Sequence, residues 1–108
     1  MSELEKKYRI MFGAYLGISL MDEYPLKEYI LKDIKDYIDA YIENYPLSNF
    51  NYDEFKCIVD KEESDIVKLQ DALRVGSDLN FPIELIYMIK KKIRDIRDEN
   101  RWRIKKII

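Results

Sequence analysis

Helix-breaking residues are few in this chain, and they divide it into long uninterrupted segments. The 108 residues include three glycines and three prolines. All-β folds need many tight turns, which depend on these two residues, so their scarcity favours long helices. Pro25, Pro46 and Pro82 each mark a helix end or a first turn, because proline lacks a backbone N–H. The sequence therefore predicts an all-α protein, a single compact bundle of four to five helices over residues 1–108.

Apolar residues recur with helical spacing in four segments. These segments cover residues 2–21, 25–44, 52–75 and 82–107. Ser2 is expected to begin the first, because Ser2 and Glu5 have the spacing of a capping box. Asn51 and Glu54 have the same spacing at the start of the third. The last segment is long and basic.

The third segment leaves two interpretations open. The charged stretch 60–64 interrupts its apolar pattern, so either one helix continues through it or Ser64 caps a second helix. We slightly favour the break. Gly76 is typical of a helix C-terminus, and Asp78 or Asn80 is expected to cap the last helix.

The most apolar stretch, residues 10–21, contains two glycines four positions apart. Its 12 residues are too few to span a membrane, which takes about 20. Glu3 and Glu5 stand where a signal peptide would carry positive charge. Gly13 and Gly17 instead predict a close approach by another helix. We expect a soluble, cytoplasmic protein that binds no membrane.

The residue content excludes many kinds of reactive site. The chain has no histidine, and Cys57 is its single cysteine. Ser–His and Cys–His catalysis, histidine metal sites, cysteine-rich zinc sites and an internal disulfide are therefore excluded. The sequence also has no phosphate-binding glycine loop and no calcium-binding loop. We expect a protein that is not an enzyme and has no cofactor or metal, with Cys57 buried and inert in a reducing compartment.

Charge is unevenly distributed along the chain. Residues 1–89 hold 10 Lys and Arg against 18 Asp and Glu, a net charge of −8. Residues 90–108 hold nine against three, a net charge of +6. The body of the protein is thus acidic and its last helix is basic, and the two parts suit different partners.

The acidic body favours a protein partner with a basic site. Complementary charge speeds association and selects the partner, although acidity also serves solubility. The candidate contact residues, on the polar side of the second predicted helix, are Tyr29, Asp33, Asp36, Asp39 and Glu43. The leading hypothesis is a non-catalytic inhibitor or antagonist that masks a basic site on a larger protein. In size, acidity and helical character the chain is similar in type to bacteriocin immunity proteins and phage-encoded inhibitors of host defence, without a shared motif.

The remaining features of the second predicted helix are interpreted as structural. Three ion pairs are expected along its exposed face: Glu28–Lys32, Lys32–Asp36 and Lys35–Asp39. The repeat YIDAYIENYP places Tyr37, Tyr41 and Tyr45 on the same arc as the aliphatic residues. These tyrosines are therefore predicted to pack, with Tyr41 in the core and Tyr37 half exposed.

Two alternative functions concern the last predicted helix. Its cations could neutralise the phosphates of nucleic acid, with a base stacked on the tryptophan. The residues of this hypothesis are Arg94, Arg97, Arg101, Trp102 and Arg103. Interleaved acids favour a solvated helix with internal ion pairs instead. The second alternative is a homo-oligomer formed through the last helix. Its apolar positions step by three and four, as in a coiled-coil seam with one polar residue: Ile86, Ile89, Ile93, Ile96 and Asn100. A bundle helix with this side inward remains the favoured interpretation.

Overall fold

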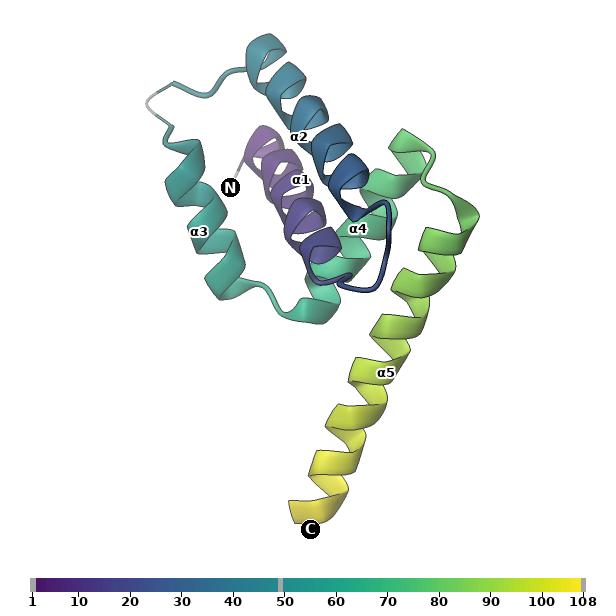
Figure 1. The fold of residues 1–108 in the computed structure, drawn as a ribbon. Helices are drawn as coiled ribbons and strands as arrows, with labels where there is room; N and C mark the ends of the chain where they lie inside the picture. Colours follow the sequence, from purple (N-terminus) through teal and green to yellow (C-terminus); the bar gives the residue numbers. More distant parts are fainter. Residues whose placement is uncertain (1, 49, 108) are drawn as a thin grey trace.

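Five helices form the fold in the computed structural model, which describes residues 2–48 and 50–107, without the side chains of 103–107. The helices are α1 (Glu3–Ser19), α2 (Lys27–Asn44), α3 (Tyr52–Glu62), α4 (Asp65–Leu79) and α5 (Ile83–Ile107). α1 is central and contacts α2, α3 and α4, whereas α5 contacts α4 and extends away from the body (Figure 1). The all-α prediction of four to five helices is confirmed.

Side-chain caps define three helix starts. Ser2, Asn51 and Ser64 each accept a hydrogen bond from the backbone N–H three residues later, at 3.1, 3.0 and 3.2 Å. Such a bond satisfies a donor that the first turn of a helix leaves unpaired. Because Glu63 has an extended backbone and Ser64 caps α4, residues 52–75 form two helices and the predicted break is confirmed.

α5 begins beside Pro82 as predicted, but the predicted end of α4 and the predicted cap of α5 are wrong. Gly76 lies buried inside α4, where an added Cβ would be 2.5 Å from the ring of Phe81. α4 ends instead at Asn80, which adopts the left-handed conformation with a φ of 54°. Asparagine tolerates this conformation better than most residues. Asp78 lies within α4, so neither Asp78 nor Asn80 begins α5.

Gly13 and Gly17 allow α4 to pack closely against α1, as predicted. A Cβ added to Gly17 would lie 2.3 Å from the backbone oxygen of Lys68. One added to Gly13 would lie 2.1 Å from Oδ2 of Asp71. Either distance is too short for a side-chain carbon. The fully buried residues of these two helices include Met11, Ala14, Ile18, Leu69 and Ala72.

Tyr8 joins the end of α2 to α1. Its side chain is fully buried, and its single hydroxyl proton is shared between the backbone oxygens of Tyr45, at 2.7 Å, and Tyr41, at 3.2 Å. Burial raises the pKa of the Tyr8 hydroxyl above its ordinary value. Tyr37 and Tyr41 are half-buried and Tyr45 is 56% exposed. Tyr41 therefore lies at the edge of the core and not inside it as predicted, with its ring against the buried Tyr8 of α1 at 5.6 Å and against Tyr45 at 4.9 Å. Tyr45, also predicted to pack, is mostly exposed.

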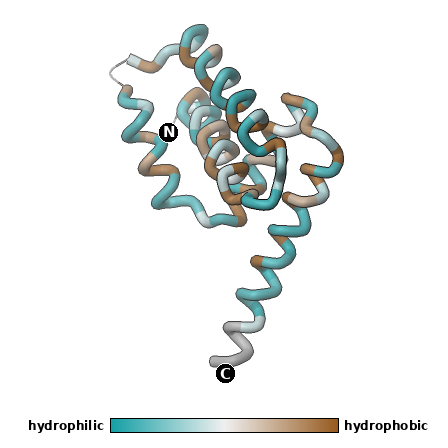
Figure 2. The backbone as a smooth tube through the Cα atoms, viewed as in Figure 1, coloured by the Kyte–Doolittle hydropathy of each residue, from teal (hydrophilic) through white to brown (hydrophobic). Residues whose placement is uncertain are grey.

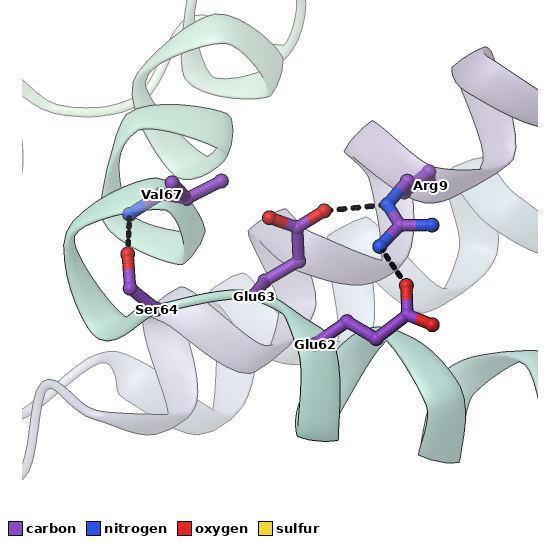
Figure 3. A network of polar contacts seen from close by, with 5 residues as sticks. All are labelled: Arg9, Glu62, Glu63, Ser64 and Val67. Atoms are coloured by element: carbon purple, nitrogen blue, oxygen red, sulfur yellow. Dashed lines mark hydrogen bonds and ion pairs between the residues drawn. The ribbon is translucent and has the colours of Figure 1, made fainter.

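Arg9 joins α1 to the connection between α3 and α4 (Figure 3). Its guanidinium donates through Nε to Glu63 and through Nη2 to Glu62. The next residue, Ser64, caps α4 through the backbone N–H of Val67. The two ion pairs of Arg9 thus hold this turn against α1, and the cap fixes the start of α4.

Cys57 is exposed, so its predicted burial is wrong. α3 buries Phe55 and Val59, each two positions from Cys57. Two positions correspond to about 200° around a helix, so Cys57 lies on the opposite face. One face of α3 packs on α1, and the thiol is on the solvent side.

Candidate functional site

α5 consists of a packed half and a projecting half. Leu85, Ile89 and Ile93 are buried, whereas every residue from Arg97 to Trp102 is exposed. Its 25 residues correspond to a length of about 37 Å. The C-terminal end of α5 lies far from the body (Figure 1), and hydrophilic residues predominate along this half (Figure 2). The projecting half is therefore accessible from several sides.

The predicted oligomer seam is largely covered by the chain itself. Ile89 and Ile93 are 0% and 5% exposed, and Ile86 and Ile96 are half-buried. Asn100 lies on the projecting half and is exposed. This side of α5 therefore packs mainly against the body of its own chain.

The basic residues of α5 form a stripe along its surface. Lys90, Arg94, Arg97 and Arg101 are four, three and four positions apart, which places them within an arc of about 60°. All four are exposed, and none forms an ion pair with another residue whose side chain is described. The acid Asp95 pairs instead with Lys91, off the stripe, at 2.9 Å. We call these four residues the basic stripe.

The first three residues of the basic stripe border a groove between α4 and α5. The groove has a volume of about 460 Å³. Its lining residues are Gln70, Leu73, Tyr87, Lys90, Ile93, Arg94 and Arg97. This described lining contains three cations and no carboxylate. A concave surface with one sign of charge and apolar walls concentrates ions of the opposite sign, so the groove favours an anionic ligand.

Tyr87 is the aromatic residue of this surface. It lines the groove and is 66% exposed. Trp102, the residue predicted for base stacking, is also exposed but lies about 100° around α5 from Arg101. Arg103 belongs to α5, but its side chain lies outside the described residues. The sequence prediction missed Tyr87 and Lys90, although a helical projection places both beside Arg94.

The outer face of α2 carries the predicted protein-contact residues. Tyr29 is 71% exposed, and Asp33, Asp36 and Glu43 lie with it within an arc of about 80°, with Asp39 on the flank. All four carboxylates are exposed.

The three ion pairs predicted along α2 do not form between the described side chains of this helix. Exposed ion pairs contribute little, so their side chains remain solvated. This face therefore has unpaired negative charge around an exposed aromatic ring.

Among the residues that the structure describes, no group of three or more Asp, Glu or Cys side chains is placed to hold a metal ion. Within the described part of the chain, no helix has the length and apolar character needed to cross a membrane. The chain matches no protein-family model, no curated protein and no solved structure.

Asp71 is the ionisable group most affected by folding. Its side chain is buried against Gly13. Burial, together with repulsion from Glu63, raises the pKa of the Asp71 carboxyl to about 7, although Arg74 and Arg9 oppose the shift. Asp71 belongs to the contact between α1 and α4, where its carboxyl lies next to Gly13.

Proposed function

We propose that this protein binds nucleic acid, without catalysis, through the basic stripe of α5. The observation that carries the proposal is that Lys90, Arg94, Arg97 and Arg101 are aligned, exposed and unpaired with any described side chain. Each cation that neutralises a phosphate releases a condensed counterion, which favours binding. The stripe extends about 16 Å along α5, which corresponds to about five phosphates of one strand.

The acidic residues of the body do not oppose this proposal strongly. The C-terminal half of α2 and the projecting half of α5 lie at opposite ends of the molecule (Figure 1). Electrostatic repulsion in physiological salt is largely screened beyond about 8 Å. Asp22 and Glu23 lie closer, beside Lys91, Lys92 and Asp95 of α5, but these three residues are on another side of α5 from the basic stripe. A polyanion on the basic stripe would therefore contact cations first.

Salt-dependent binding tests the proposal. If four phosphates are neutralised, we expect the affinity for duplex DNA to fall about 100-fold between about 50 and about 200 mM salt. The double substitution Arg94→Glu with Arg97→Glu should abolish measurable binding in a fluorescence-anisotropy titration. The matched control is Lys32→Glu with Lys35→Glu, which changes the net charge equally on α2 and should retain most of the affinity. Salt-independent binding, or an equal loss in both variants, would contradict the proposal.

A second function is supported by the unpaired carboxylates on α2. A protein with a basic site fits the face that contains Tyr29, Asp33 and Asp36, and we infer that this protein would mask such a site as an inhibitor. The test is affinity capture from the native host with tagged wild type and with an Asp33→Lys, Asp36→Lys variant. A Tyr29→Ala variant is tested alongside them. The assignment is contradicted if the captured protein binds Tyr29→Ala as well as it binds the wild type, or if the charge-reversed variant still retains it.

A further inference from the structure

We propose that the groove between α4 and α5 holds single-stranded nucleic acid, with a base stacked on Tyr87 and phosphates on Lys90, Arg94 and Arg97. The inference rests on the proposed function and specifies the form of nucleic acid that this surface selects. It depends on three features of the groove: its exposed ring, its apolar wall and its position beside α4.

Tyr87 is the first of these features. Its ring is 66% exposed at the groove, and it makes no hydrogen bond, ring contact or cation–π contact with another described residue. Every nucleobase has a π face, so an exposed aromatic ring next to cations can stack on a base of any sequence. The ring is also one turn from Lys90 and two turns from Arg94 on α5, so a strand can contact ring and cations together.

The wall of the groove suits an unpaired nucleotide. Leu73 from α4 and Ile93 from α5 supply apolar surface. Gln70 supplies an amide that can both donate to and accept from a base edge. The cations lie along the same groove, so one nucleotide can place its base against the apolar wall and its phosphate on a guanidinium.

The position of the groove favours a single strand over a duplex. The ring of Tyr87, the apolar wall and the cations all line one groove between α4 and α5. The faces of paired bases are covered by their neighbours, and Tyr87 could not stack on them. A single strand offers unstacked bases without that cost.

The experiment compares a labelled single-stranded DNA of about 12 nucleotides with its duplex, a length within the usual range for such sites. We expect the wild type to prefer the single strand. Tyr87→Ala should weaken single-strand binding by about 5- to 100-fold, whereas Tyr87→Phe, which keeps the ring, should not. Trp102→Ala is the matched control, because it removes an exposed ring from the same helix away from the groove, and it should have no comparable effect.

Each outcome supports or overturns the inference. If the protein binds duplex and single-stranded DNA with equal affinity, or if Tyr87→Ala loses no affinity, the single-strand assignment is overturned. The proposed function would still stand in that case if binding remained salt-dependent and needed the basic stripe. No salt-dependent binding to either DNA overturns both. If poly-glutamate displaces the labelled DNA as effectively as unlabelled DNA of equal charge does, the groove is a site for acidic peptides and the inference is overturned. Unchanged thermal melting of Tyr87→Ala shows that its effect does not come from unfolding.

Discussion

The close packing of α1 on α4 leads to a prediction about Gly17. An alanine Cβ at this position would lie 2.3 Å from the backbone oxygen of Lys68 and 2.7 Å from its carbonyl carbon. Backbone atoms cannot rotate away, so the two helices must separate by about 1 Å to restore an ordinary contact. Gly17→Ala should therefore destabilise the fold, although alanine is the better helix former.

The magnitude follows from two opposing terms. Alanine gains about 1 kcal/mol over glycine in a helix interior. Overpacking costs about 1 to 3 kcal/mol, and a gap of about 1 Å forfeits up to about half of the dispersion energy of the affected contacts. Backbone atoms leave little room for adjustment, so the overpacking cost lies near the top of this range. We therefore expect a net loss of about 2 kcal/mol in the free energy of unfolding, which lowers the melting temperature by about 8 to 10 °C in a domain of this size.

Gly13 supplies the comparison, because its obstacle is a side chain. The nearest atom to an added Cβ there is Oδ2 of Asp71, at 2.1 Å. Asp71→Ala should therefore rescue Gly13→Ala in a double-mutant cycle, with a coupling of about 1 to 2 kcal/mol. It should not rescue Gly17→Ala. Denaturant titrations followed by circular dichroism measure each free energy. A neutral Gly17→Ala, or its rescue by Asp71→Ala, would show that the helices are not in backbone contact there.

Two further predictions concern ionisation and reactivity. The pKa of the Asp71 carboxyl is raised in the folded state to about 7, so the unfolded chain loses this proton at a lower pH than the folded chain does. The free energy of unfolding should therefore fall by about 2 to 4 kcal/mol as the pH rises from about 4 to about 7. Asp71→Asn should flatten this part of the curve of denaturation midpoint against pH, whereas Asp36→Asn, on the exposed face of α2, should leave it unchanged. Cys57 should react with a thiol reagent in the native protein as fast as in urea, and strong protection when folded would place it in the core.

The secondary structure was predictable because its determinants are local. Ser2, Asn51 and Ser64 cap helices through atoms three residues away. The apolar spacing that defines a helix repeats within seven positions. Gly13 and Gly17 were also informative, because two small residues on one face of a helix leave room for a neighbour in any fold. The division of charge between body and last helix is a property of the sequence itself.

The errors concern how side chains pack or remain solvated, which residue type and spacing alone do not determine. Gly76 looked like a helix end, but the ring of Phe81 fills the space where its side chain would be. Cys57 is of a type often buried, yet α3 packs through its other face. The ion pairs expected on α2 depended on spacing alone, and solvated side chains have little reason to adopt that geometry.

The candidate binding surface needed both levels. The sequence alone is enough to identify α5 as a long basic helix with cations at helical spacing, because charge and period are local properties. A helical projection of the sequence also places Tyr87 beside Lys90 and Arg94. The packing of α4 against one side of α5, and the groove that these residues share with Gln70 and Leu73, are found only in the folded structure. A groove exists only between two elements, and the choice of neighbour depends on how the whole apolar surface is buried.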